Sequence, residues 1–251
     1  MARWSKYENF LSVNNVGNLV QKWSYDTGAA VFSPPVMING KVYAGSGNGN
    51  VYALNANTGT ELWSFQTGNA VYSSPAVEHG VVYVVSYGNY VYALDVETGA
   101  ELWSFSALND YAVGSSPAVA NGVVYFGSGD SNVYALNAKT GAKIWSYTTG
   151  GPVQSSPAVA NGVVYVSSDQ MYALSAKTGA LLWGYAGGGS DSSPAVSNGE
   201  FTSAEATACT RSTPPPATSC GATRPAIMCI PRLPLRMTWS TLAQATLPCM
   251  R

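Results

Sequence analysis

Short apolar runs recur along the chain between Gly- and Asn-containing pairs, and they follow one another in the same order each time. A Ser-Pro segment such as YSSPAV comes first, and runs such as VVYVVS, VYAL and ELWSF follow it. Runs of Val, Tyr and Trp between turn residues are typical of β-strands, and Asn-Gly supplies the positive φ of tight hairpins. The pattern predicts four antiparallel strands per unit, and it lacks the 3.6-residue period of a helix.

The units repeat at a spacing of about 40 residues, and one eleven-residue segment shows this repeat clearly. ALDVETGAELW (Ala93–Trp103) has close copies at Ala53–Trp63, Ala135–Trp145 and Ala173–Trp183. Four antiparallel strands repeating at this spacing are typical of a β-propeller. The expected fold is therefore all-β, a partial β-propeller with four complete four-stranded antiparallel blades. A β-sandwich is the alternative, but it gives no reason for near-identical units.

Prolines mark the beginning of the first strand in each unit. Because proline cannot donate a ladder hydrogen bond, this strand is expected to have a free edge or to begin at the proline. The innermost strand of a propeller blade has such an edge, facing the central channel. The prolines assigned to this position are Pro34, Pro75, Pro117, Pro157 and Pro194.

The repeated string is expected to fasten each blade to its neighbour. Asp95 can bond to nearby backbone and fix a turn, and Gly99 can adopt the left-handed conformation. Trp103 follows on the outer strand, where a docked indole buries roughly 150–250 Å² and needs an acceptor for its N–H. Structural docking roles are therefore predicted for Trp23, Trp63, Trp103, Trp145, Trp183, Ala53, Asn55, Thr58, Gly59, Ala93, Asp95, Thr98, Gly99, Ala135, Asn137, Thr140, Gly141, Ala173, Ser175, Thr178 and Gly179.

These residues resemble the pyrroloquinoline-quinone (PQQ) repeat family, whose docking pattern is A-x-D-x-x-T-G-x-x-x-W. Ala93–Trp103 matches the pattern fully, and the other three copies differ at the Asp position. The resemblance covers about residues 12–200. It implies an intact propeller of seven or eight blades, in which each docking Trp stacks against the neighbouring blade. Residues 15–28 are similar to a strand that pairs with the last blade to close the ring.

The resemblance also raises PQQ and Ca²⁺ as cofactors, because quinone-dependent dehydrogenases of the family hold both. Those enzymes carry adjacent cysteines over the quinone, and no two of the four cysteines here are adjacent. Glu61 and Glu101 precede outer-strand tryptophans. Surface turn positions account for Asp110, Asp130, Asp169, Asp191 and His79. The sequence therefore indicates no cofactor, no metal ligand set and no catalytic residue, with PQQ and Ca²⁺ expected only in a dehydrogenase.

Composition and charge narrow the class of function. The chain is 46% hydrophobic and 10% charged, with a net charge of −1. Residues 1–200 are mildly acidic and contain no basic stripe, which argues against nucleic-acid binding. No apolar run is long enough to span a bilayer, and the start MARWSKYENF lacks the apolar core of a signal peptide.

The repeat pattern stops after residue 200. Residues 201–251 contain all four cysteines and only one glycine. A Thr/Pro-rich linker is one interpretation. The other is translation out of frame, because a shifted reading of Met228–Arg251 can give VYSSPAVADDVVYVGSGDVAVYA, which aligns with Val71–Ala93. We expect this tail to be irregular or disordered and to carry no selected chemistry.

The sequence thus predicts three parts: residues 1–28 as a lead-in segment and outer strand of a closing blade, 29–200 as four repeats with the start of a fifth, and 201–251 as the tail. The leading hypothesis for function is a non-catalytic propeller fragment whose loops bind a protein or small ligand. A fragment of a quinone-dependent alcohol or sugar dehydrogenase is the alternative, and a surface adhesion array is a third. Exposed blade faces are expected to self-associate. The resemblance implies a periplasmic or extracellular location.

Overall fold

The computed structural model describes residue 17 and residues 19–88, 90–107, 114–186, 192–197, 200–204 and 209–212. The chain divides into two compact units, Met1–Pro214 and Pro215–Arg251, and all of the described residues lie in the first. The described strands form four sheets of four strands and one sheet of three, all antiparallel. This arrangement confirms the expected all-β fold of four-stranded antiparallel blades.

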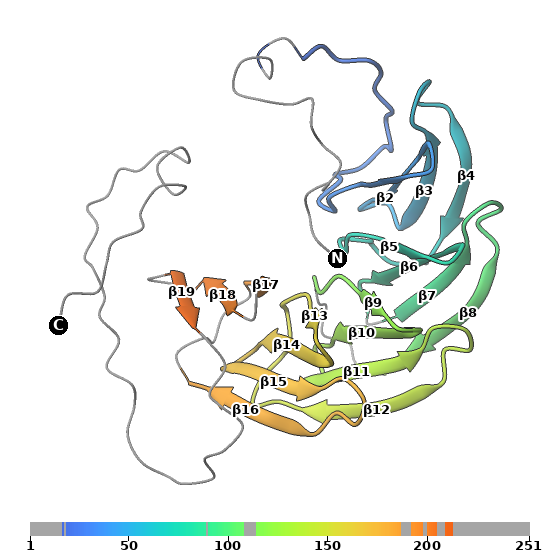
Figure 1. Cartoon of the computed structure of the whole chain (residues 1–251). Coiled ribbons are helices and arrows are strands. Elements are labelled where there is room, and N and C mark those ends of the chain that lie inside the picture. The colour runs from blue at the N-terminus through green and yellow to red at the C-terminus, as the bar shows by residue number, and fades with distance from the viewer. Residues whose placement is uncertain are drawn as a thin grey trace, which may run out of the picture. The chain divides into compact units, whose positions relative to one another are not determined.

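Each sheet is built from strands that are consecutive in the chain, and we call the sheets blades 1 to 5 (Figure 1). Blades 1 and 2 contain β1 (Val36–Ile38), β2 (Lys41–Gly45), β3 (Asn50–Asn55), β4 (Glu61–Gln66), and β5 (Ala76–Glu78), β6 (Val81–Ser86), β7 (Tyr90–Asp95), β8 (Glu101–Ser106). Blades 3 and 4 contain β9 (Ala118–Ala120), β10 (Val123–Gly127), β11 (Asn132–Asn137), β12 (Lys143–Thr148), and β13 (Ala158–Ala160), β14 (Val163–Ser167), β15 (Met171–Ser175), β16 (Leu181–Tyr185). Blade 5 has three strands, β17 (Ala195–Ser197), β18 (Glu200–Ala204) and β19 (Cys209–Ser212).

In each complete blade the connections lie at the two ends of the strands, and we use the word edge for each of these two sides of the blade. At one edge lie the first hairpin, such as Asn39–Gly40 with φ of 49° and 74°, and the turn between the third and fourth strands. We call this the docking edge. At the other edge lie the Ser-Pro segment and the hairpin between the second and third strands, and we call it the serine edge.

The hydrophobic core lies between blades rather than inside any one of them. One cluster joins Tyr43, Val51 and Trp63 of blade 1 to Val82 and Leu94 of blade 2. Equivalent clusters join blade 2 to blade 3, and blade 3 to blade 4. The innermost strands of successive blades are also in contact, from β1 to β17. Because the two middle strands of each complete blade pack on both faces, their sequences read as continuous apolar runs such as VYAL.

A chain of serines links the Ser-Pro segments of successive blades. Ser74 N–H donates to Ser116 Oγ at 2.8 Å, Ser116 N–H to Ser156 Oγ at 2.9 Å, and Ser156 N–H to Ser193 Oγ at 2.9 Å. The strand register aligns Pro35, rather than Pro34, with Pro75. Pro34 therefore occupies the position of Ser74, where it has no N–H to donate, so the serine chain begins at blade 2.

Part of the predicted irregular tail is regular. Residues 201–204 continue β18 and residues 209–212 form β19, so the expectation of an irregular segment is wrong for these residues. Ladder hydrogen bonds use only backbone groups, and Phe201 and Thr202 favour strands, so pairing does not require the side chains of the repeat. The expectation for 213–251, and the reading-frame hypothesis drawn from Met228–Arg251, lie outside the described residues.

Residues 19–28 form no ladder with the described strands, and their pairing with a closing blade stays a prediction. None of the helices in the described ranges has the length and apolarity needed to cross a bilayer.

The serine chain yields a matched pair of variants. Ser116→Ala removes the acceptor of the Ser74 N–H and should lower the free energy of unfolding by about 1 kcal/mol. Ser74→Ala is the control, because no hydrogen bond of the Ser74 hydroxyl is present among the described residues and the preceding Pro34 has no donor. Urea titration of both variants measures the difference. Equal losses would contradict a role for the inter-blade hydrogen bond.

Candidate functional site

The four described tryptophans that precede a complete blade dock in the same way. The indole Nε1–H of Trp63 donates to the carbonyl oxygen of Val96 in blade 2 at 3.2 Å. The other three bonds run from Trp23 to Ala56, from Trp103 to Ala138 and from Trp145 to Ala176, each at 3.0 Å. Trp183 contacts the ring of Tyr165 with centroids 6.0 Å apart. Each docked indole thus crosses from one blade, or from the lead-in segment, to the next blade.

A glycine forms the floor under each docked ring. Gly99 has a φ of 72°, and a Cβ built on it would lie 2.7 Å from the ring of Trp63. A side chain at this position would therefore suffer both backbone strain and a clash. The same close approach occurs for Gly59 under Trp23, Gly141 under Trp103 and Gly179 under Trp145.

The turn that carries this glycine is held by the residue at the Asp position of the motif. Asp95 Oδ1 accepts hydrogen bonds from the backbone N–H of Glu97 and Thr98, and from Thr98 Oγ1 at 2.8 Å. These bonds lower the pKa of the Asp95 carboxyl, because they favour its charged form. Asn55 and Asn137 accept the two equivalent backbone bonds, which include those from Thr58 and Thr140. At Ser175 the backbone keeps the turn: Gly179 N–H donates to Ser175 O, and Thr178 Oγ1 accepts from Ala180.

The alanine that opens each string completes the contact by being small. All four alanines are fully buried, and each stands directly opposite the tryptophan of its own blade in the strand ladder: Ala53, Ala93, Ala135 and Ala173. The register shifts immediately after each alanine, as in a β-bulge. The bulge leaves the residue before each tryptophan exposed, as at Leu62 and Leu102.

A tyrosine on the second strand shares the acceptor of the tryptophan, and sequence reasoning missed it. Tyr83 donates its hydroxyl to Ala138 O at 3.1 Å, the oxygen that also accepts from Trp103. Tyr43 and Tyr125 make the equivalent bonds to Val96 and Ala176, both at 3.2 Å. Burial raises the pKa of Tyr83, so its phenol keeps its proton and remains a donor. The signal available in the sequence was the tyrosine that stands at the same place in every unit.

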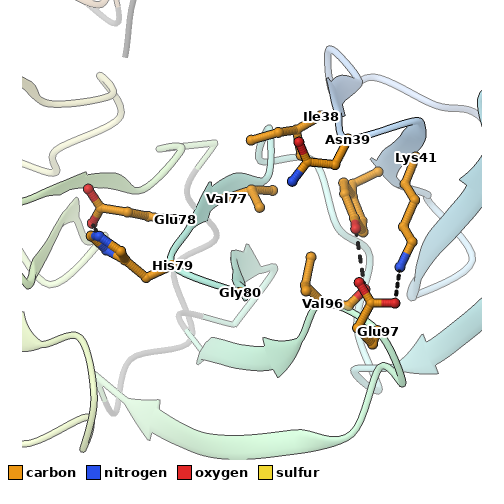
Figure 2. A pocket seen from close by; sticks show the side chains of 10 residues that line it. Ile38, Asn39, Lys41, Val77, Glu78, His79, Gly80, Val96 and Glu97 are labelled. Carbon is orange, nitrogen blue, oxygen red and sulfur yellow. Dashed lines mark hydrogen bonds and ion pairs between the residues drawn. The ribbon is translucent and has the colours of Figure 1, made fainter.

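A cavity of about 210 Å³ opens at the docking edge between blades 1 and 2 (Figure 2). Lys41 and Tyr43 of blade 1 and Glu78, His79 and Glu97 of blade 2 are among the residues that line it. Lys41 Nζ lies 2.6 Å from Glu97 Oε2, so an ion pair crosses the junction. Because the Glu97 side chain is 72% exposed, solvent screens the pair, and it stabilises the junction by less than about 1 kcal/mol.

The charged residues of this cavity depart from the repeat. The place of Lys41 is taken by valine in blades 2 to 4, and that of Glu97 by lysine in blades 3 and 4. Alanine replaces Glu78 in blades 3 and 4, and asparagine replaces His79 in blades 1, 3 and 4. The burial of Tyr43, followed by the charges of Glu97 and Asp95, raises its pKa to about 12. Lys41 and Glu97 therefore meet across this junction, whereas the side chains of Glu78 and His79 lie beside each other and point away from that pair (Figure 2).

The other acidic residues considered in the sequence lie apart from one another. Asp130 accepts from Tyr134 at 2.5 Å and Asp169 from Tyr172 at 2.9 Å, each within its own blade. Glu61 accepts from Tyr25 and from Ser64 on the outer strand. The ranges that the structure describes contain no group of three or more His, Cys, Asp or Glu side chains that could hold a metal ion. Asp110 and Asp191 lie outside the described residues.

Four-stranded antiparallel sheets that stack face to face through such docking contacts define the chain as a β-propeller protein. A family model described as outer membrane protein assembly factor BamB matches residues 12–118 and 89–208. The chain therefore belongs to this family of PQQ-like repeat proteins, as the motif resemblance implied. A comparison with curated proteins gives no match.

Several solved propellers share the fold at low sequence identity. BamB from Moraxella catarrhalis aligns with a TM-score of 0.67 at 18% identity, covering 75% of this chain and 63% of that one. The quinohemoprotein alcohol dehydrogenase from Comamonas testosteroni aligns with 0.61 at 17%, covering 73% and 39%. A europium-containing methanol dehydrogenase aligns with 0.63 at 19%, covering 70% and 45%. The chain thus spans less than two thirds of each relative, and at these identities the likeness shows the fold alone.

That the shared carbonyl fastens the blades is a proposal, which a double-mutant cycle tests. Tyr83→Phe and Trp103→Phe each remove one donor to Ala138 O and leave the other. We expect Tyr83→Phe alone to cost about 1 kcal/mol. The double variant leaves the carbonyl without these donors, so its cost should exceed the sum of the single costs by about 1–2 kcal/mol. Chemical unfolding measures all four proteins, and simple additivity would argue against a shared acceptor.

The Asp95 turn yields a prediction about pH. A carboxyl whose pKa is lower in the folded state stabilises the fold above its unfolded pKa, and this stabilisation is lost as the pH falls through the folded value. Asp95→Asn should fold normally, because Asn occupies this position in blades 1 and 3. The variant should lose less stability than the wild type between pH 5 and pH 3, measured by urea unfolding at each pH. Parallel curves for the two proteins would show that the Asp95 carboxylate contributes nothing.

Proposed function

We propose that this chain is a non-catalytic propeller that acts as a binding or scaffold module. The observation that carries the proposal is the division of labour among its side chains. The residues that repeat in every unit pack the blades and dock them to one another, whereas Lys41, Glu78, His79 and Glu97 depart from the repeat and line one cavity. Side chains that packing does not require, and that remain partly exposed around a cavity, are suited to contacts with a partner.

The alternative function is that of a quinone-dependent alcohol or sugar dehydrogenase, of which the chain would be a part. The fold shared with the alcohol and methanol dehydrogenases favours it. Ca²⁺ binds through several oxygen ligands, commonly carboxylates. The carboxylates in the described ranges do not converge, and no step can be assigned to PQQ or Ca²⁺ from them.

The binding role also suits the place that the resemblance implies. The family to which the chain belongs is that of the outer membrane protein assembly factor BamB. This membership supports a periplasmic or extracellular location for the chain. The partner is proposed to be a protein or small ligand that contacts the loops at the blade edges, and blade faces left uncovered are proposed to self-associate.

The full chain can be tested for quinone chemistry directly. Purified protein is incubated with PQQ and Ca²⁺, desalted, and examined for retained quinone by absorbance and for alcohol-dependent dye reduction. We expect no retained quinone and no dye reduction, while the far-UV spectrum shows that the protein is folded. Stoichiometric quinone retention with dye reduction that depends on ethanol or glucose would overturn the non-catalytic proposal.

A further inference from the structure

Aromatic side chains gather at the serine edge of blades 1 and 2, whereas the cavity lies at the docking edge. Phe32 and Tyr72 meet edge to face with centroids 5.3 Å apart, and Tyr72 and Tyr87 do so at 5.6 Å. Tyr90, in the same hairpin as Tyr87, stacks on Tyr92. Phe32 is 69% exposed, Tyr87 46% and Tyr90 38%. We call Phe32, Tyr72, Tyr87 and Tyr90 the aromatic surface.

These aromatic residues are not part of the repeat. The position of Phe32 and Tyr72 holds glycine in blade 3 and glutamine in blade 4. Tyr87 is replaced by Gly47 in blade 1 and Gly129 in blade 3, and Tyr90 is replaced by asparagine in both. Blade packing therefore does not require the three tyrosines, because neighbouring blades fold without them.

The aromatic surface is held on a rigid support and keeps polar groups free. Tyr87 N–H donates to Ala70 O at 2.7 Å, which ties the hairpin to the loop that carries Tyr72. Among the described residues, the hydroxyls of Tyr72, Tyr87 and Tyr90 have no hydrogen-bond partner, whereas Tyr43, Tyr83, Tyr92 and Tyr125 all use theirs. The exposed side-chain amide of Asn69 lies beside Gly88 in the same hairpin and is likewise unpaired within the described chain.

The segments that form the aromatic surface contain no charged residue. Residues 29–33, 46–50, 66–74 and 86–90 include no Asp, Glu, Lys, Arg or His. A nucleic acid needs cations to neutralise its phosphates, and a charged peptide needs an opposite charge, so neither is matched here. Exposed rings beside unpaired phenol and amide groups match a ligand that has apolar C–H faces and many neutral hydroxyls.

We propose that the aromatic surface of blades 1 and 2 binds a neutral oligosaccharide. Sugar rings present their C–H faces to Tyr72, Tyr87 and Tyr90, and their hydroxyls pair with the free phenol groups and with Asn69. The inference rests on the proposed binding role and names the chemical class of the ligand. A proline-rich peptide is the competing occupant, since it also stacks on tyrosines, but it offers few donors to an amide and a row of phenols.

The repeat supplies the variants that test the proposal. Tyr87→Gly and Tyr90→Asn introduce the residues that blades 1 and 3 already have at these positions, so the fold should be retained, as verified by an unchanged Tm. The matched control is Leu102→Ala, which removes a 52% exposed side chain from the outer strand of the same blade. Calorimetric titration of the full chain uses cellohexaose, maltohexaose and chitohexaose as neutral probes, hexagalacturonate as a charged probe and decaproline as the peptide.

We expect at least one neutral hexasaccharide to bind with a dissociation constant below about 1 mM, and hexagalacturonate to bind more weakly. Tyr87→Gly and Tyr90→Asn should each weaken binding about tenfold, while Leu102→Ala changes it less than twofold. Absence of binding by all three neutral probes, or equal binding by the tyrosine variants and the control, would overturn the inference. Tyrosine-dependent binding of decaproline in place of the sugars would also overturn it. None of these outcomes bears on quinone retention, so the quinone assay tests the non-catalytic proposal independently of sugar binding.

Discussion

We propose that the stacking of the complete blades depends on one carbonyl oxygen at each junction between them. At the junction of blades 2 and 3 this is the oxygen of Ala138, which accepts from both the indole of Trp103 and the phenol of Tyr83. The N–H of the same residue donates to Gly122 O within its own blade. One peptide position therefore connects the turn of a blade, its first hairpin and the preceding blade. Because the carbonyl can reach these donors only if the glycine floor is free of a side chain, the turn motif and the tryptophan must be inherited together.

Much of the fold could be predicted from the sequence, because a repeat displays the same local pattern four times. The period, the strand order and the role of Asn-Gly hairpins all follow from short-range rules. The shared donor Tyr83 was missed because its partner Ala138 lies in another unit, where no local pattern indicates it. The serine chain was missed for the same reason, since Ser74 and Ser116 are 42 residues apart. The strands β18 and β19 were missed because their backbone pairing does not depend on the motif.

The candidate binding regions were harder to predict than the fold. Lys41 and Glu97 lie in different blades, and only the stacked structure brings them to one cavity. The aromatic surface likewise combines residues from two blades and three loops. Both regions contain side chains that differ from their counterparts in the other blades. In a propeller the fold does not decide the chemistry, so these departures are the informative part of the sequence.

The docking contact has a further consequence for how such chains change in length. Each unit of about 40 residues presents an indole on one side and the matching glycine-floored turn on the other, so its two sides are complementary to each other. Such a head-to-tail interface is satisfied by any additional copy of the same unit. Duplication or loss of a unit therefore leaves every remaining junction chemically intact. The number of blades can drift during evolution without the invention of a new interface, and only the curvature of the stack limits which numbers close into a ring.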